Sequence, residues 1–230
     1  MKPLSFKQVD EPALERAIAA LSPFVTPERQ RRIDEVLASK TRELVLVLED
    51  IYDEQNASAV LRTAESFGVL EVHAVERTCS FIVDRQIALG SQKWIELYKH
   101  KSTDQPYTAL AERGYAIYAS SIRGDAIDID AVPIDRPLVL VFGNEHEGLS
   151  IEAQEAASGR FRVPMRGFVE SLNVSVATAI SMYDVLARMR KSGRRLELDP
   201  LDRLRLRAAW FARSVRAAKP ILERAGVVLS

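Results

Sequence analysis

The stretch from Arg162 to Asp184, RVPMRGFVESLNVSVATAISMYD, carries polar residues that could hold a ligand. A β-favouring run leads into a polar loop, and small and branched residues follow from Asn173, which predicts a strand, a loop and a buried helix. Gly167 supplies a flexible backbone, while Ser171 or Asn173 can cap the free N–H groups of the helix. A ligand-binding loop is one interpretation, and a capped helix start alone is the other.

Asn56 and Arg62, in NASAVLRTAESFG, are a second candidate pair. In a continuous helix, residues six apart differ by about 240° and point in different directions. We therefore expect the two side chains to converge only if Asn56 precedes the helix as its N-cap. Without such convergence, Asn56 is only a helix cap and Arg62 only a surface residue.

The third cluster is FGNEHEGLS, residues 142–150, which directly follows an apolar run. Gly143 lets a ligand approach the backbone at the end of a buried strand, and Gly148 permits a tight turn. Glu145 could act on a ligand or cap neighbouring N–H groups. His146 is a residue type that binds metals, but the other two histidines are distant in the sequence and no HExxH spacing exists, so we predict no metal site.

Taken together, these clusters resemble the three motifs of the SPOUT methyltransferases, in the version carried by the TrmH family of RNA ribose 2′-O-methyltransferases. In that family an asparagine is followed six residues later by an arginine, the second motif has glycine, glutamate and glycine, and the third resembles VPMRGFVESLNVSVATAISMYD. Three motifs in the family's order, within residues 44–186, are far more specific than any one of them.

The resemblance implies properties that composition and periodicity do not. It implies that the end of the sheet domain is threaded as a trefoil knot, that the protein is a homodimer, and that S-adenosyl-L-methionine is the methyl donor. Backbone groups of the pocket loops would read the adenine, so that no GxGxxG phosphate cradle is needed. The residues implied to line the donor pocket are Ser120, Ser121, Gly143, Val163, Met165 and Leu172.

The resemblance also implies which residues act on the substrate. Arg62 would be the catalytic arginine beside the ribose and phosphate, with Asn56, Glu145, Ser171 and Asn173 positioning it and the substrate. The family's arginine is proposed as the general base, although a guanidinium normally stays protonated in proteins. A phosphate clamp and electrostatic stabiliser needs no such deprotonation.

The elements that must position these residues follow from alternating apolar strands and helical runs, which predict an α/β domain over residues 43–190 with a mostly parallel sheet flanked by helices. Leu44–Leu48 is an unbroken apolar run, typical of a strand buried on both faces. A helix ending at Gly68 and a strand over Glu71–Val75 complete a right-handed β-α-β unit. We expect further strands over 94–98, 115–119, 137–142 and 161–163, and short helices over 107–113 and 151–157.

Helical extensions are expected over residues 1–42 and 191–230. Thr26 before Pro27 and Asp199 before Pro200 each combine a capping side chain with a proline at the first helical position. After Asp199, apolar residues three and four apart form one stripe that reaches Ala218 and should pack on the domain or on a second subunit.

The charge of the chain is unevenly distributed. The net charge is zero, but residues 188–219 contain 11 Lys/Arg and 3 Asp/Glu, a local balance of 11 − 3 = +8. Such a basic end favours a nucleic-acid partner, and a solvated helical face is the alternative. The arginines expected to bind RNA are Arg29, Arg32, Arg203, Arg205 and Arg207.

The composition is that of a globular chain, with 230 residues of which 47% are hydrophobic and 28% charged. A single cysteine, Cys79, excludes an internal disulfide framework, and residues 1–25 carry no signal-peptide pattern, so we expect a cytoplasmic protein. No stretch approaches the ~20 apolar residues of a membrane-spanning helix, so no membrane partner is expected.

Basic helices on both sides of the catalytic domain resemble the arrangement in family members that methylate guanosine 18 in the D-loop of tRNA. Members that act on ribosomal RNA often carry a separate N-terminal RNA-binding domain, for which the leader here is too short. We therefore predict 2′-O-methylation of a tRNA ribose. The alternatives are methylation of ribosomal or another RNA, and a non-catalytic RNA-binding module.

Overall fold

The computed structural model describes residues 4–122, 124–227 and 229, and the chain divides into two compact units. One is Thr41–Leu196, which we call the sheet unit. The other joins both ends of the chain, Met1–Lys40 and Glu197–Ser230, and we call it the terminal unit. All three sequence motifs lie in the sheet unit.

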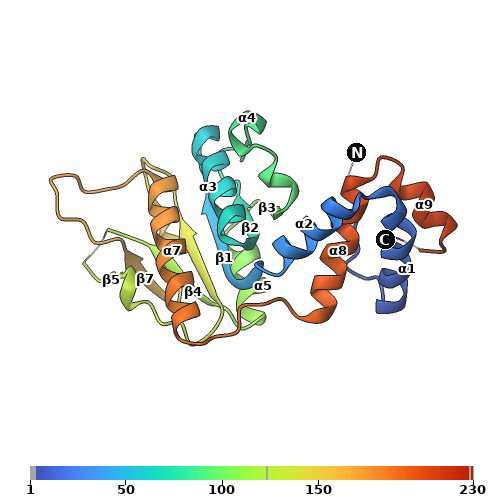
Figure 1. Cartoon of the computed structure of the whole chain (residues 1–230). Helices are drawn as coiled ribbons and strands as arrows, with labels where there is room; N and C mark the ends of the chain where they lie inside the picture. Colours follow the sequence, from blue (N-terminus) through green and yellow to red (C-terminus); the bar gives the residue numbers. More distant parts are fainter. Residues whose placement is uncertain (1–3, 123, 228, 230) are drawn as a thin grey trace. The chain divides into compact units, whose positions relative to one another are not determined.

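The sheet unit is built on a seven-stranded sheet in the order β3-β2-β1-β6-β4-β7-β5 (Figure 1). All neighbouring strands in it are parallel. This confirms the predicted α/β class with a mostly parallel sheet flanked by helices. The strands are β1 (Thr41–Glu49), β2 (Val69–Val75), β3 (Glu96–His100), β4 (Ala116–Ser120), β5 (Ile127–Asp128), β6 (Leu138–Phe142) and β7 (Gly159–Arg162).

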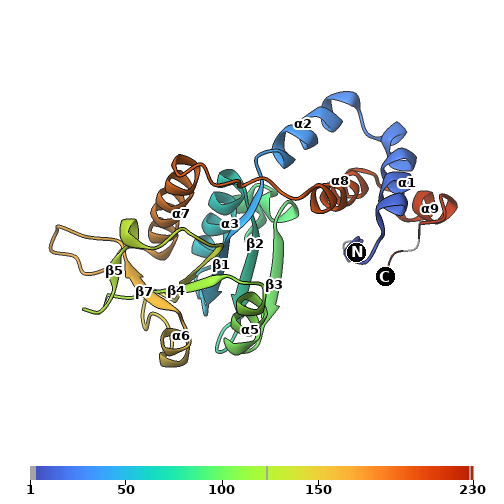
Figure 2. The same ribbon diagram turned by 90° about the horizontal axis from the view of Figure 1, so that it is seen from below.

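Helices cover both faces of this sheet. Figure 2 shows α3 and α7 on one face and α5 and α6 on the other. On β1, Leu46 and Leu48 join the apolar cluster with α3 and α7, while Val45 and Val47 join the one with α5 and α6. Burial on both faces explains why this strand is an unbroken apolar run. The helices are α3 (Glu54–Phe67), α4 (Arg85–Ala88), α5 (Asp104–Glu112), α6 (Ile151–Glu155) and α7 (Val174–Lys191), with the 3-10 turns η2 (Ser91–Lys93) and η3 (Ile129–Ala131).

The start of α3 corrects the prediction that Asn56 caps this helix. The N-cap is Asp53, whose carboxylate accepts the Gln55 N–H at 2.7 Å. Asn56 lies inside the first turn, because the Asp53 side chain, three residues earlier, already satisfies a free N–H group at the helix start. At the other end, Gly68 stops the helix with a left-handed φ of 88°, as predicted.

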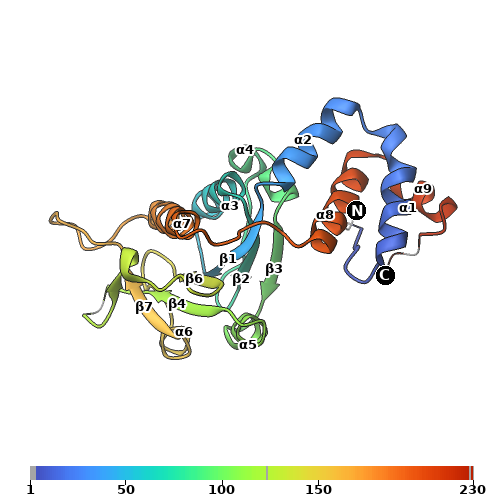
Figure 3. The same ribbon diagram turned by 60° about the horizontal axis from the view of Figure 1, so that its bottom comes forward.

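Other details of the sheet also differ from the prediction, among them β7, which spans Gly159–Arg162 and not 161–163. The strand predicted over 94–98 is β3, Glu96–His100, because Trp94 closes the 3-10 turn η2 before the chain enters the sheet. β5 was not predicted, since two residues at a sheet edge carry almost no periodicity. Figure 3 shows the segment between β7 and α7 leaving the sheet as a long loop, in agreement with the predicted strand, loop and helix.

The terminal unit contains four α-helices among the described residues. They are α1 (Glu11–Leu21), α2 (Pro27–Leu37), α8 (Pro200–Ser214) and α9 (Ala218–Arg224), with the turn η1 (Ser22–Phe24). α1 packs against α8 and α9, and α2 packs against α8. Capping side chains start three of these helices, and the two expected from Thr26 and Asp199 are confirmed.

The stripe predicted to reach Ala218 in one helix is wrong beyond Ser214. Val215 is extended, with φ −113° and ψ 120°, and ends α8. The stripe of α8 packs on the N-terminal helices, a partner that the sequence did not indicate. The predicted stripe consisted of Leu201, Leu204, Ala208, Phe211, Val215 and Ala218. The buried residues of α8 also include Leu206 and Trp210.

Candidate active site

The site is built at the carboxyl ends of four strands, β1, β4, β6 and β7. Because the sheet is parallel, these ends lie at one edge. β6 pairs with both β1 and β4, and β4 pairs with β7, so the loops that leave these strands are neighbours. The chain reverses its direction across the sheet between β1 and β6, which is where parallel α/β sheets form ligand crevices.

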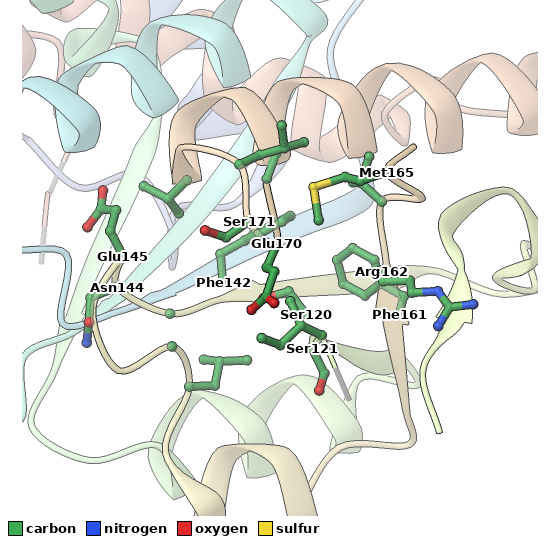
Figure 4. A pocket seen from close by; sticks show the side chains of 18 of the residues that line it. Ser120, Ser121, Phe142, Asn144, Glu145, Phe161, Arg162, Met165, Glu170 and Ser171 are labelled. Carbon is green, nitrogen blue, oxygen red and sulfur yellow. The ribbon is translucent and has the colours of Figure 1, made fainter. Parts of the chain in front are cut away.

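A cavity of about 960 Å³ opens at this edge (Figure 4). Small-molecule sites commonly occupy about 300–1,000 Å³. Phe142 and Phe161 give it an apolar wall, with ring centroids 5.6 Å apart in an edge-on arrangement. The cavity is lined by all six residues predicted to bind the donor, Ser120, Ser121, Gly143, Val163, Met165 and Leu172.

A chain of hydrogen bonds joins the three motifs at the rim of the cavity. Asn173 Nδ2 donates to Asn56 Oδ1 at 3.0 Å. Asn56 Nδ2 in turn donates to the Glu145 carboxylate. The Asn56 oxygen accepts from Asn173 and its nitrogen donates to Glu145, so the orientation of the Asn56 side chain is fixed from both sides.

Asn173 has a second role as the N-cap of α7, as the sequence predicted. Its Oδ1 accepts the N–H of Ser175 at 2.8 Å and the Ser175 hydroxyl at 2.6 Å. The same side chain therefore starts the buried helix with its oxygen and holds Asn56 with its nitrogen. Ser171, two residues earlier, lines the cavity.

Arg62 is exposed on α3 and lies outside the residues that line the cavity. Because Asn56 is inside the same helix, six residues of separation place the two side chains about 120° apart around its axis. Within one chain, the structure therefore brings together Asn56, Glu145, Asn173 and the cavity that holds Ser171, and leaves Arg62 apart from them.

The loop after β6 is shaped by two glycines. A Cβ on Gly143 would lie 2.2 Å from the carbonyl carbon of Gly148, so Gly143 is required by the loop's own packing, a reason the sequence did not reveal. Gly148 has a φ of 71° and makes the predicted turn. Between them, buried Asn144 accepts the N–H groups of His146 and Glu147 at 2.9 and 2.8 Å. The loop that presents Glu145 is thus rigidly tied.

A buried carboxylate that the sequence analysis did not single out anchors this loop. Glu49, 2% exposed, accepts the Ser150 N–H at 2.8 Å and the Thr103 hydroxyl at 2.7 Å. Its neighbour Asp50, at a left-handed φ of 49°, accepts the backbone N–H of Arg77 at 2.9 Å. The signal in the sequence was a carboxylate pair directly after an apolar strand.

The lining of the cavity is more acidic than basic. Asp128, Glu145, Glu147 and Glu170 line it, against one arginine, Arg162, which pairs with Asp128 at 2.8 Å. Figure 4 shows Glu170 and Met165 turned into the cavity. This balance suits a ligand that carries positive charge. Among the residues that the structure describes, no three His, Cys, Asp or Glu side chains converge as metal ligands do.

The most strongly perturbed acid lies away from the cavity. Burial alone would raise the pKa of Glu71, but bidentate hydrogen bonds from Arg113, at 2.6 and 2.9 Å, and a bond to His73 outweigh it and hold the pKa well below its ordinary value. His73 also stacks on His100. Glu71 also accepts a hydrogen bond from Arg42 at 3.1 Å, and Arg113 also donates to the Tyr115 hydroxyl at 3.2 Å, so we interpret this network as structural.

The predicted RNA-binding arginines belong to the terminal unit and differ in how exposed they are. Arg29 and Arg203 are exposed, and Arg32 forms an exposed ion pair with Glu35. Arg205 is half-buried. Arg207 binds Asp34 through two hydrogen bonds of 2.7 and 3.0 Å and lies over a phenylalanine ring.

Part of the basic charge near the end of the sheet unit is also committed to structure. Arg188 donates to the carbonyls of Val132 and Ile129, and Arg194 donates to the Ile134 carbonyl and the Glu43 carboxylate. The local charge of +8 therefore overstates the positive surface available to a partner. No helix in the described ranges has the length and apolar character needed to cross a bilayer.

The parallel sheet and the cavity at its carboxyl edge together define a class of enzyme. Comparison with known sequences identifies that class. The sequence model of the SpoU rRNA Methylase family matches residues 43–183, and the chain belongs to this family. The family predicted from the three motifs is thereby confirmed.

Relatives within the family have specific names. The chain is 38% identical over 208 residues to a tRNA (guanosine(18)-2'-O)-methyltransferase of Borreliella burgdorferi, covering 90% of this chain and 95% of the relative. An enzyme of the same name from Thermus thermophilus is 38% identical over 188 residues, covering 81% and 97%. A crystal structure of an A. aeolicus TrmH/SpoU tRNA modifying enzyme superposes with a TM-score of 0.74 at 30% identity, covering 82% of this chain and 97% of that one.

Proposed function

We propose that this protein transfers a methyl group from S-adenosyl-L-methionine to the ribose 2′-hydroxyl of guanosine 18 in tRNA. The observation that carries the proposal is the hydrogen-bond chain Asn173–Asn56–Glu145, which ties three separate motifs together at the rim of a cavity. Relatives named for this activity align over 81–90% of the chain.

The size and charge of the cavity support its assignment as the donor site. When bound, S-adenosyl-L-methionine supplies a methyl group on a positively charged sulfur, which makes that carbon electrophilic. The acidic lining suits this charge, the phenylalanine wall suits an adenine ring, and the six residues predicted for the donor surround the space. Ser121 also ties the loop after β4 to β7, since its N–H donates to the Phe161 carbonyl at 2.8 Å.

The residues at the rim act on the RNA. A ribose 2′-hydroxyl is a weak nucleophile at neutral pH, so aligning it with the methyl carbon should contribute much of the rate enhancement of methyl transfer. Asn56, fixed by Asn173 and Glu145, is placed to orient the ribose. The guanidinium of Arg62 holds the adjoining phosphate, which stabilises charge that develops near the sugar.

A homodimer accounts for two features of the sheet unit. An apolar stripe on α7 is formed by Val176, Ile180 and Tyr183, and these three residues are each 42–65% exposed. Arg62 is exposed and outside its own chain's cavity. We propose that two chains pair across this stripe, so that Arg62 of one subunit serves the cavity of the other.

The remaining parts of the proposal concern topology, RNA contacts and compartment. The long loop between β7 and α7 is threaded as a trefoil knot, as in the family that the motifs resemble. Arg29, Arg32, Arg203 and Arg205 face the tRNA, while Arg207 mainly joins α8 to α2 through Asp34. The protein acts in the cytoplasm, where tRNA is modified.

Ribosomal RNA is the second candidate substrate, because the family description names rRNA. The two are separated by incubating the purified protein with labelled S-adenosyl-L-methionine and either unmodified tRNA or ribosomal RNA. Transfer to tRNA that is lost when guanosine 18 is replaced by adenosine supports the proposal. Transfer to ribosomal RNA alone, or to another tRNA position, refutes the assigned substrate.

The role of Arg62 is tested with Arg62→Ala, which should abolish transfer and leave donor binding intact. Arg136→Ala is the matched control, because this exposed arginine precedes β6 and so lies at the opposite edge of the sheet. If Arg62 acts across subunits, mixing Arg62→Ala with Glu145→Ala chains should restore part of the activity. Full activity of Arg62→Ala would remove Arg62 from the mechanism.

A further inference from the structure

Two exposed aromatic rings, Tyr52 and His146, lie together beside the cavity. Their centroids are 6.4 Å apart and their planes are inclined by 51°. Tyr52 is 48% exposed, and His146 is exposed as well. Neither ring takes part in the hydrogen-bond chain that joins the motifs. Exposed ring faces next to a ligand cavity are surfaces on which another planar group can stack.

The Tyr52 side chain and the backbone that carries His146 are each held by a hydrogen bond. The Tyr52 hydroxyl forms a hydrogen bond of 3.0 Å with the Thr78 hydroxyl. The backbone N–H of His146 is bound by Asn144 at 2.9 Å, within the loop that Gly143 and Gly148 shape. A surface that is already ordered loses little conformational entropy when a ligand binds to it. The pair is therefore suited to recognition.

The rings flank the hydrogen bond between the first two motifs. Tyr52 lies four residues before Asn56 in the sequence, and His146 directly follows Glu145. Since Asn56 donates to Glu145, the two rings are positioned from both ends of that bond. His146 also lines the cavity. A planar group on these rings would thus sit next to the residues proposed to orient the ribose.

Negative charge near the two rings favours an uncharged planar ligand over an anionic one. Asp53, Glu54 and Glu147 are exposed and lie within two residues of Tyr52 or His146 in the sequence. These carboxylates repel a phosphate, whereas an uncharged base carries no such penalty and can offer N–H groups to them. Stacking of bases on aromatic side chains is also the common way in which proteins hold an unpaired nucleotide.

We propose that Tyr52 and His146 form a stacking platform for the purine base of the nucleotide whose ribose is methylated. The proposal rests on the proposed function and adds to it the group that holds the base. A base taken out of the folded RNA regains on Tyr52 part of the stacking it gives up. Its ribose is then held at the rim beside Asn56.

Kinetics with variants of Tyr52 test the platform. Tyr52→Leu should raise the KM for tRNA about tenfold, the effect of losing one stacked base, with donor affinity by calorimetry unchanged. Tyr52→Phe keeps the ring and should restore the KM to within about threefold of wild type. Ile82→Ala, which removes a 55% exposed apolar side chain elsewhere in the sheet unit, is the control and should leave the KM unchanged.

Fluorescence gives a readout that does not depend on turnover. The methylated position is mapped first, and 2-aminopurine is placed there in the RNA; stacking on Tyr52 should quench its emission on binding. In Tyr52→Leu the bound RNA should stay bright, and in His146→Asn it should be partly quenched. Equal quenching and equal KM in wild type and Tyr52→Leu would overturn the platform while leaving the methyltransferase intact. Absence of transfer by the wild-type protein to any RNA would refute the proposed function itself.

Discussion

Asn173 is the residue at which helix formation and the proposed chemistry are most directly linked. Its oxygen caps α7 and its nitrogen donates to Asn56 at 3.0 Å. Replacement by aspartate keeps the capping oxygen and removes the donor, whereas replacement by alanine removes both. The pair of variants therefore separates the two roles of a single side chain.

The magnitudes follow from these contacts. Asparagine and aspartate are equally good caps, so Asn173→Asp should change the free energy of unfolding by less than about 0.5 kcal/mol, while Asn173→Ala should cost about 1 kcal/mol. In Asn173→Asp, Asn56 has a carboxylate on each side. It can donate to Glu145 or to the new aspartate, but its oxygen then faces the other carboxylate. Loss of this fixed orientation should lower kcat about 10- to 100-fold.

Urea unfolding measures the first effect, and steady-state methylation of a tRNA transcript measures the second. The expected pattern is a stable but slow aspartate variant, and an alanine variant impaired in both. A fully active Asn173→Asp protein would show that the amide chain does not orient the substrate. An aspartate variant as unstable as the alanine variant would contradict the capping argument.

Three further predictions concern stability. Gly143→Ala should destabilise the sheet unit by about 2 kcal/mol or more, because the new Cβ would overlap the Gly148 backbone, whereas Gly167→Ala has open space and should be neutral in urea unfolding. The hydrogen bond from Lys99 lowers the pKa of Glu76 from 4.5 to about 2. Ionised Glu76 therefore contributes to the free energy of unfolding above pH 4.5, and this contribution is lost as the pH falls through 2. Glu76→Gln should flatten the dependence of the unfolding free energy on pH in this acid range. Deleting residues 197–230 should also unfold α1 and α2, which circular dichroism would report as a helix loss larger than α8 and α9 supply; intact α1 and α2 would contradict their packing on α8.

Local features of the fold were predictable because neighbouring residues cause them. The run Leu44–Leu48 is apolar at every position since β1 is buried on both faces. Helix starts at Thr26, Asn173 and Asp199 depend on a side chain that bonds an N–H group two or three residues later. The error at Asn56 arose in the same way, because Asp53, three residues earlier, was an equally capable cap.

The residues of the candidate site could be named from motif spacing, but their contacts could not. Asn56 and Glu145 are 89 residues apart, and Asn56 and Asn173 are 117 apart. Their meeting depends on β6 lying between β1 and β4, an order that no local pattern encodes. The role of Glu49 could not be predicted either. A carboxylate at the end of an apolar run is expected in solvent, but Glu49 is buried and anchors the loop that presents Glu145.

For this protein, sequence alone determined the family, the strand and helix segments and the types of residue available for chemistry, because each follows from short-range periodicity, capping or motif spacing. Tertiary structure decided that the two ends of the chain form one helical unit, that Arg207 is held by Asp34 across 173 residues, and that Arg62 stands outside its own cavity. These outcomes depend on which apolar faces and charges meet across long loops, and that choice is made by the packing of the whole chain.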